Sequence, residues 1–146
     1  MTVEDALGVL ADALKRCDVP LWKPPASLEP VEKLQAAVSP MRVPEDVLEF
    51  WRLIDVTTLR VMPYPMFSTP DFALSGWELA KREFAAFQPL ALFGVGYQSH
   101  DTMSVELDVG DVPGGALFEW FVSDPNAGFT RKFNALGDWV AYISRR

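Results

Sequence analysis

Side chains that commonly carry out chemistry in proteins are scarce in this chain of 146 residues, which has one histidine, His100, and one cysteine, Cys17. A nucleophilic enzyme of the Ser-His-Asp or Cys-His type needs its histidine within hydrogen-bond reach of the nucleophile. His100 lies in the polar segment Gln98-Ser99-His100-Asp101, far along the chain from Cys17. We therefore expect no catalytic residue of this kind, and a single cysteine excludes an internal disulfide.

Carboxylates are the remaining reactive groups. Asp108 and Asp111 flank Gly110, but their spacing does not match an EF-hand loop, and one histidine provides no ligand cluster. Glu106 and Asp108 have the spacing of neighbours on one face of a strand, an arrangement that some glycosidases use across a cleft. Such a pair is more often the solvated face of a strand. We expect no metal and no cofactor, and an enzyme that uses Glu106, Asp108 or Glu119 is the weakest alternative.

One glycine motif has the appearance of a nucleotide site. Gly94-Val95-Gly96 matches the start of a dinucleotide-binding fingerprint, but Ser99 occupies the third glycine position. The residues that follow enter a strand, whereas the fingerprint opens a helix. We interpret the motif as a loop.

Acidic residues are distributed unevenly along the chain, whose formal net charge is -7. Between Glu83 and Thr130 there are seven acids and neither a Lys nor an Arg, whereas the remainder holds 13 of each sign. Such a segment is negative unless folding brings bases to it. Solubility alone is the commoner cause, and a docking face for a basic partner is the alternative. Negative net charge disfavours direct nucleic-acid binding. The acids are Glu83, Asp101, Glu106, Asp108, Asp111, Glu119 and Asp124.

Aromatic residues divide into two groups. A base-stacking platform would need interleaved Lys or Arg, which the predicted sheet lacks, so residues at core spacing are expected in the core. Trp77, Tyr97 and Trp120 have less obvious positions and are candidates for an interface, where such residues act as anchors. The residues at core spacing are Phe50, Trp51, Phe118 and Trp139.

Helices are predicted in the first third of the chain. Thr2 is a suitable cap for a helix whose apolar residues from Ala6 to Leu14 recur at helical spacing. A connector from Pro20 to Pro30 is rich in proline. It leads to a short helix over Val31–Val38 and then to a helix entered through Pro44.

Signals in the middle of the chain are mixed. A short strand is predicted over Leu59–Met62, and the prolines that follow predict an irregular segment. Ser75-Gly76-Trp77-Glu78 has the spacing of a capping box, in which each polar side chain bonds a backbone N–H of the other residue. The sequence therefore predicts that a helix starts here and continues over Leu79–Phe87.

The last third of the chain is predicted to be a sheet closed by a helix. Asn134 is a suitable cap for this helix, whose apolar stripe contains Trp139 and packs on the sheet. Helices followed by strands and one more helix indicate an α+β fold with an antiparallel sheet of about four to six strands. The predicted strands are Leu90–Phe93, Met103–Asp108, Ala116–Val122 and Phe129–Phe133. The stripe of the helix is Leu136, Trp139, Val140 and Ile143.

Strand alternation groups the acids. It places Met103, Val105 and Leu107 on the core face and Ser104, Glu106 and Asp108 on the wet face. If the next strand is antiparallel, Glu119 lies near Glu106 and Asp108. The sequence thus predicts one acidic face.

Length and composition predict one globular domain over residues 1–146, with 49% hydrophobic residues. Glu4 and Asp5 stand where a secretory signal would carry bases, and no apolar run reaches the roughly 18 residues of a membrane span. We therefore expect a cytoplasmic protein that does not bind a membrane.

Several short motifs together resemble the SUKH superfamily. The resemblance covers residues 31–143, so residues 1–30 form an N-terminal helix and connector ahead of it. The motifs are Val43-Pro44-Glu45-Asp46-Val47-Leu48-Glu49-Phe50-Trp51, Pro89-Leu90-Ala91-Leu92-Phe93-Gly94-Val95-Gly96, Ser104-Val105-Glu106-Leu107-Asp108, Gly115-Ala116-Leu117-Phe118-Glu119-Trp120 and Asn134-Ala135-Leu136-Gly137-Asp138-Trp139-Val140.

The resemblance implies an α+β domain that binds proteins and does not catalyse a reaction. Many bacterial members look like immunity proteins that neutralise a cognate toxin, frequently a nuclease. Opposite charges on an acidic inhibitor and a basic toxin would accelerate their encounter. A regulatory scaffold with a cellular partner is the alternative, and a toxin gene immediately upstream would distinguish the two. The expected contact residues are Tyr97, His100, Asp101, Glu106, Asp108, Asp111, Glu119 and Trp120.

Overall fold

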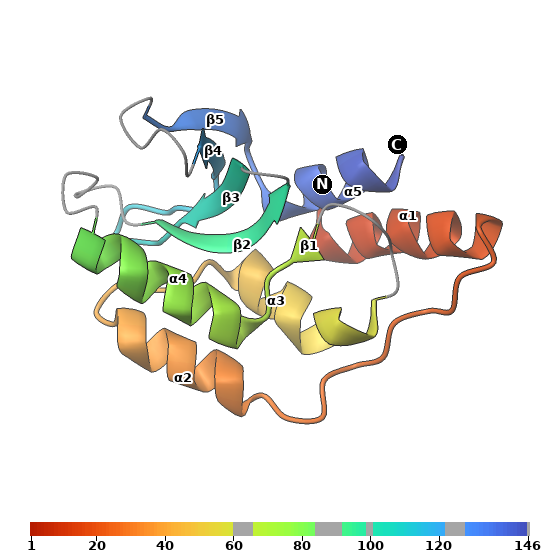
Figure 1. The fold of residues 1–146 in the computed structure, drawn as a ribbon, viewed down its shortest axis with the longest axis horizontal. Coiled ribbons are helices and arrows are strands. Elements are labelled where there is room, and N and C mark those ends of the chain that lie inside the picture. The colour runs from red at the N-terminus through yellow and green to blue at the C-terminus, as the bar shows by residue number, and fades with distance from the viewer. Residues whose placement is uncertain (60–65, 84–91, 99–100, 122–127, 146) are drawn as a thin grey trace.

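The computed structural model describes residues 1–59, 66–83, 92–98, 101–121 and 128–145 (Figure 1). The helices are α1 (Val3–Arg16), α2 (Glu29–Val38), α3 (Glu45–Leu53), the 3-10 turn η1 (Val56–Thr58), α4 (Pro70–Glu83) and α5 (Leu136–Ser144). The strands are β1 (Met66–Phe67), β2 (Leu92–Gln98), β3 (Asp101–Glu106), β4 (Leu117–Phe121) and β5 (Thr130–Phe133). They form one sheet in chain order with antiparallel neighbours, which confirms the α+β prediction.

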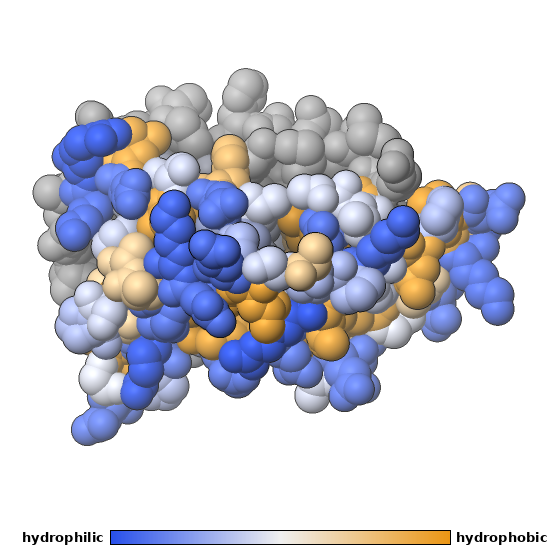
Figure 2. All heavy atoms as spheres, turned by 90° about the horizontal axis from the view of Figure 1, so that it is seen from below, coloured by the Kyte–Doolittle hydropathy of each residue, from blue (hydrophilic) through white to orange (hydrophobic). Residues whose placement is uncertain are grey.

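Two layers make up the molecule. Helices α2, α3 and α4 lie on one side of the sheet, and α1 runs beside α5 at one end of it (Figure 1). Helix α4 packs against β2 and α2, whereas α5 touches β5 but packs mainly along α1. Figure 2 shows the face seen from below, where hydrophilic residues surround hydrophobic areas. Because α5 contacts both α1 and β5, this closing helix joins the N-terminal helix to the sheet.

The N-terminal helices follow their sequence signals. Thr2 Oγ1 accepts a hydrogen bond from the Asp5 amide at 3.1 Å, as expected of an N-cap. Helix α2 starts at Glu29, ahead of the predicted Val31, because Pro30 lies in the first turn, where no N–H is needed. Pro44 stands at the N-cap of α3, as its position indicates.

The proline-rich connector is fixed to the body of the protein. Trp22 packs against the hydrophobic core. The Lys23 amide donates to Thr58 Oγ1 at 2.8 Å, and the Asp55 amide donates to the Lys23 carbonyl, also at 2.8 Å. These contacts hold the connector against η1.

Helix α4 starts earlier than predicted. Its first residue is Pro70, and Thr69 Oγ1 accepts from the Phe72 amide at 3.1 Å. Thr69 and Pro70 act as N-cap and first-turn residue, so Ser75 and Glu78 lie inside the helix and form no capping box. The predicted start was therefore wrong. Trp77, a candidate interface anchor, is buried.

Two strand predictions need correction. Leu59 follows η1 as its C-cap, and residues 60–62 of the predicted strand lie outside the described residues. Gly94-Val95-Gly96, interpreted as a loop, lies inside β2, where the register to β3 shifts between Gly94 and Gly96. Glycine at both positions is typical of such an irregularity, because it has no side chain to obstruct the bend.

The start of α5 also differs from prediction. Ala135 is the N-cap residue and provides no side-chain hydrogen bond. Asn134 Oδ1 instead accepts from Arg131 Nη2 at 2.9 Å. The predicted cap was wrong, and a side chain from α3 replaces it.

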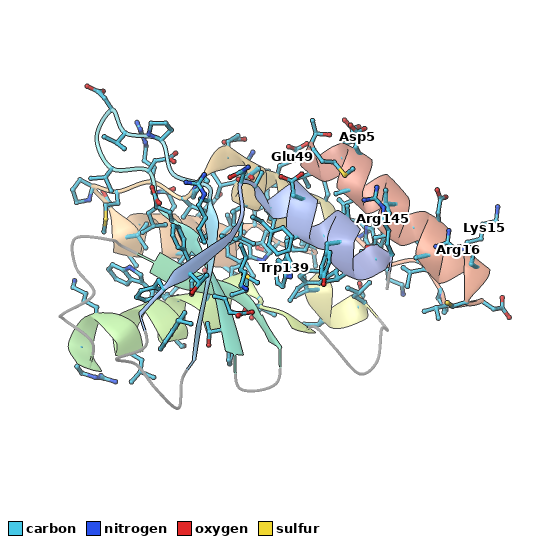
Figure 3. The ribbon with its side chains drawn as sticks, turned by 90° about the horizontal axis from the view of Figure 1, so that it is seen from above. Asp5, Lys15, Arg16, Glu49, Trp139 and Arg145 are labelled. Atoms are coloured by element: carbon cyan, nitrogen blue, oxygen red, sulfur yellow. The ribbon has the colours of Figure 1, made fainter. Side chains whose placement is uncertain are left out.

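An aromatic chain links the closing helix to the rest of the core. Trp139 is 1% exposed and points from α5 into the molecule (Figure 3). Its ring lies edge-on to Phe67 of β1 at 5.3 Å, and Phe67 lies edge-on to Phe50 of α3 at 5.2 Å. Such pairs are favourable beyond their buried area. The prediction of a buried Trp139 is confirmed.

Candidate functional site

The predicted acidic face begins on β3, where alternation holds for the core side. Met103, Val105 and Leu107 are all buried. Ser104, expected on the wet side, is only 2% exposed, because Trp120 Nε1 donates to its hydroxyl at 3.0 Å. The outer face of this strand is thus partly covered and is not uniformly solvated.

Glu119 does not join Glu106. The register of β3 and β4 places Glu119 opposite Met103, and directly opposite residues share a face of the sheet. Glu106 lies on the other face, which it shares with Ser104. The expected grouping of Glu106, Asp108 and Glu119 is therefore wrong.

Bases from outside the acidic segment reach into it. Lys132 Nζ lies 3.8 Å from Glu119 Oε1. Arg42 Nη2 donates to the Gly110 carbonyl at 2.8 Å. The negative potential expected from the sequence is consequently reduced at these positions.

Asp108 has a structural role. Its carboxylate accepts a hydrogen bond from the Gly114 amide at 2.6 Å, and its backbone forms an antiparallel bridge with Arg42. A Cβ atom at Gly114 would lie 2.3 Å from the Glu106 carbonyl oxygen, so only glycine permits this approach. Asp108, Arg42 and Gly114 together hold the loop that joins β3 to β4.

The tip of this loop is a tight hairpin, which we call the β3–β4 hairpin (residues 108–115). Val109 and Val112 exchange two backbone hydrogen bonds of 2.9 and 3.0 Å around Gly110 and Asp111. Gly110 has φ of 56°, which glycine adopts without strain. The hairpin projects away from the sheet (Figure 3).

Apolar side chains are exposed at this tip. Val109 is 45% and Val112 is 64% exposed, and Asp111 beside them is also exposed. The two valines share one face of the hairpin, because they are directly opposite. A fixed, projecting loop with an apolar pair and one acid is suited to contact another protein. The sequence predicted Asp111 as a contact residue but not the two valines. Their positions on either side of Gly110-Asp111 were the signal that was available.

The other predicted contact residues are less informative. Trp120 is partly buried, and its ring lies 5.6 Å from that of Phe129. Tyr97 pairs with Thr102 and Asp101 pairs with Gln98 in the backbone of the sheet. The side chains of Tyr97 and Asp101, and the whole of His100, lie outside the described residues. Phe118, expected in the core, is only partly buried.

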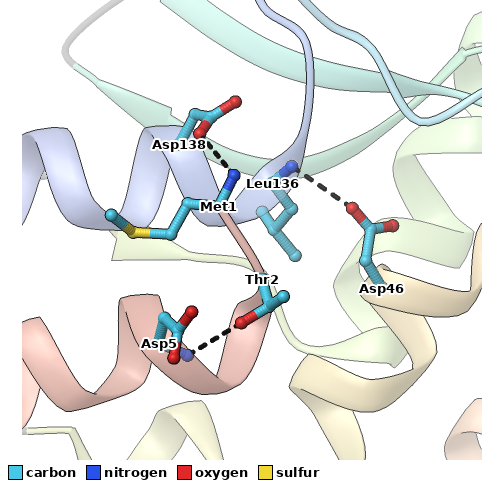
Figure 4. Close-up of polar contacts among 6 residues, drawn as sticks. All are labelled: Met1, Thr2, Asp5, Asp46, Leu136 and Asp138. Carbon is cyan, nitrogen blue, oxygen red and sulfur yellow. Dashed lines mark hydrogen bonds and ion pairs between the residues drawn. The ribbon is translucent and has the colours of Figure 1, made fainter.

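Asp46 is a carboxylate that the sequence did not single out. Its Oδ2 accepts from the Leu136 amide at 3.3 Å, at the start of α5 (Figure 4). Burial raises the pKa of the Asp46 carboxyl above its usual range, and the negative charge of Asp108 adds to the rise, whereas hydrogen bonds from backbone amides oppose it. Asp46 provides the capping hydrogen bond at the start of α5 that Ala135 is unable to make. The role of this carboxylate is therefore structural.

Within the described residues, no three Asp, Glu, His or Cys side chains gather as metal ligands. None of the helices traced there has both the length and the apolar character needed to cross a membrane. Comparison with known proteins gives no match to a family model, a curated protein or a solved structure.

Proposed function

We propose that this chain is a non-catalytic protein-binding module, an immunity protein of the SUKH type that neutralises a basic bacterial toxin domain in the cytoplasm. The β3–β4 hairpin carries the proposal, because it is the contact surface that the geometry favours best. The net charge of -7 and the resemblance to the superfamily support the same function. Asp111 remains from the predicted acidic face as a contact residue.

Rigidity of the hairpin supports binding. Association costs free energy for every side chain and loop that it must order. The Asp108–Gly114 hydrogen bond, the Arg42 contact with Gly110 and the paired valines already fix this loop. Little further ordering is then needed when a partner surface covers it.

The mode of inhibition follows from shape and charge. A projecting hairpin is able to enter a concave surface of a partner more readily than a flat contact face is. Nucleases are commonly basic at their substrate clefts, because they bind phosphates. In the proposed complex Val109 and Val112 pack against the wall of such a cleft, and Asp111 faces its basic residues. Access of substrate to the cleft is then blocked.

The test starts from gene context. The domain encoded immediately upstream is produced, and its binding to the full chain is measured by titration calorimetry. Co-expression measures protection of a host cell. We expect binding that weakens with salt, because charge steers the encounter. An upstream gene whose product neither binds nor harms the host would contradict the immunity function and favour a regulatory scaffold.

Variants assign the contact surface. Val109→Ser with Val112→Ser removes the apolar pair and keeps the backbone bridge. We expect at least about tenfold weaker binding, as is usual when anchors of an interface are truncated. Leu21→Ser with Leu28→Ser is the matched control, since these leucines are 58% and 40% exposed on the connector. Equal affinity of the hairpin variant and the control would refute the hairpin as the contact.

A further inference from the structure

Strand β5 lies at the edge of the sheet. It pairs with β4, and no other strand among the described residues covers its outer side. Thr130, Arg131 and Lys132 are exposed along it. The outer edge of such a strand carries backbone N–H and C=O groups that an added strand is able to bond. This edge is separate from the β3–β4 hairpin.

A hollow of about 440 Å³ adjoins the end of this edge. Phe133, the last residue of β5, contributes to it, and the Phe133 ring lies 5.5 Å from the ring of Tyr142. Tyr142 is 52% exposed. An apolar side chain of an added strand would therefore have a place to pack beyond Phe133. The lining residues are Met1, Phe133, Asp138, Ala141, Tyr142 and Arg145.

Charge decides which kind of strand fits. Arg131 and Lys132 lie on the edge, and Arg145 lies at the hollow, where the acid Asp138 is paired with the Met1 ammonium group at 3.0 Å. Arg131 donates to Asn134 Oδ1, but a guanidinium has five N–H donors, so this contact permits another. Lys132 lies 3.8 Å from Glu119, with 44% of its own side chain exposed, so a partner carboxylate is able to compete for it.

A second copy of this chain is disfavoured as the occupant. Antiparallel pairing of β5 with β5 of another molecule would bring Arg131 and Lys132 close to their own counterparts. Like charges across neighbouring strands destabilise the pair. An acidic strand would meet the same side chains with opposite charge. The edge therefore selects against itself and for an acidic partner.

We infer that β5 and the adjoining hollow form a second docking surface, which takes an extended acidic segment of another protein by strand addition. The segment lies along the outer edge of β5 and inserts an apolar side chain beside Phe133 and Tyr142. Its carboxylates face Arg131, Lys132 and Arg145. This surface serves a different partner segment from the one that meets the hairpin.

The probe is a display library of random linear peptides selected on the full chain. Enriched peptides are synthesised with a fluorophore, and their affinities are measured by fluorescence anisotropy. We expect acidic sequences that carry at least one apolar residue, which fills the hollow. N-methylation along one edge of the bound peptide removes its backbone donors and should abolish binding, whereas methylation along the other edge should leave it intact.

Charge reversal locates the site. Arg131→Glu with Lys132→Glu should weaken binding of the enriched peptides by at least about tenfold, because attraction becomes repulsion. Lys15→Glu with Arg16→Glu is the matched control, as it makes the same change at the end of α1 (Figure 3). Circular dichroism verifies that both variants are folded. Tyr142→Ala should also weaken binding of these peptides, because it removes a side chain that lines the hollow.

Other results would overturn the inference. These are a selection without enriched peptides, equal loss of binding in both charge-reversal variants, or binding that survives N-methylation along each of the two edges. Sedimentation of the free chain is the remaining measurement. A dimer that dissociates on Arg131→Glu with Lys132→Glu would show that a second copy is the occupant, and the inference would then be wrong.

Discussion

Asp46 on α3 caps α5 across 90 residues of sequence, through a hydrogen bond of 3.3 Å from the Leu136 amide. Figure 4 shows this contact beside the ion pair of the Met1 ammonium group with Asp138. One carboxylate thus joins the entry of the third helix to the entry of the last. Its raised pKa and its position give a testable pH dependence.

Asp46→Asn should change how stability depends on pH. The raised pKa means that the folded protein holds the Asp46 proton more tightly than the unfolded chain does. This contribution is fully present below the unfolded pKa and is lost as pH rises through the folded pKa. Asparagine keeps an acceptor and does not titrate. Stability of the wild type relative to Asp46→Asn should therefore fall with rising pH, then level off.

Urea unfolding of both proteins between about pH 3 and about pH 7 measures this difference. Asp46→Ala provides the control for the cap itself. It should be less stable than Asp46→Asn by about 1 kcal/mol at every pH, because neither variant titrates at this position and alanine leaves no acceptor for the Leu136 amide. A pH-independent difference between wild type and Asp46→Asn would contradict the assigned pKa shift.

Gly137→Ala should destabilise the protein. A Cβ atom at Gly137 would lie 2.4 Å from the Met1 carbonyl oxygen and 2.8 Å from that of Thr2, so the N-terminal segment must move. We expect a loss of about 1 to 3 kcal/mol, as for other overpacked sites. Gly8→Ala is the control, because a Cβ there meets nothing within 4 Å and alanine favours α1 by up to about 1 kcal/mol. Thermal unfolding compares both variants with the wild type. A Gly137→Ala variant as stable as the wild type would refute the close approach of Gly137 to the N-terminal segment.

Asp108→Ala should loosen the β3–β4 hairpin. It leaves the partly buried Gly114 amide without the carboxylate that accepts its hydrogen bond, which costs about 1 to 3 kcal/mol. Amide hydrogen exchange should accelerate at Gly114 and Val112. Asp111→Ala removes an acid of the same loop at an exposed position, and its effect should stay within about 0.5 kcal/mol. Unchanged protection at Gly114 would show that Asp108 does not fix the loop.

Trp139→Ala should cost about 3 to 5 kcal/mol, because it empties a buried site between α5, β1 and α3. Chemical denaturation measures the loss. Leu21→Ala, at a leucine that is 58% exposed, is the control and should cost much less. A loss below about 1 kcal/mol for Trp139→Ala would be inconsistent with its position in the core.

Features governed by neighbours along the chain were predictable from the sequence. The Thr2 cap, the entry of α3 after Pro44 and the buried stripe around Trp139 depend on spacing within a few helical turns. The start of α4 was also local. Thr69 and Pro70 mark it in the structure, whereas the prediction placed the start at the Ser75 to Glu78 spacing and interpreted the prolines before it as an irregular segment.

The grouping of side chains at the candidate site was decided by tertiary structure. Alternation assigns each strand two faces, but it does not say which residue of the next strand stands opposite, and a shift by one residue exchanges the faces. The register sets Glu119 opposite Met103, away from Glu106. The cap that Asp46 provides for α5 likewise depends on packing between distant elements. Sequence therefore determined the elements and their buried sides, whereas register and long-range contacts determined which polar groups meet.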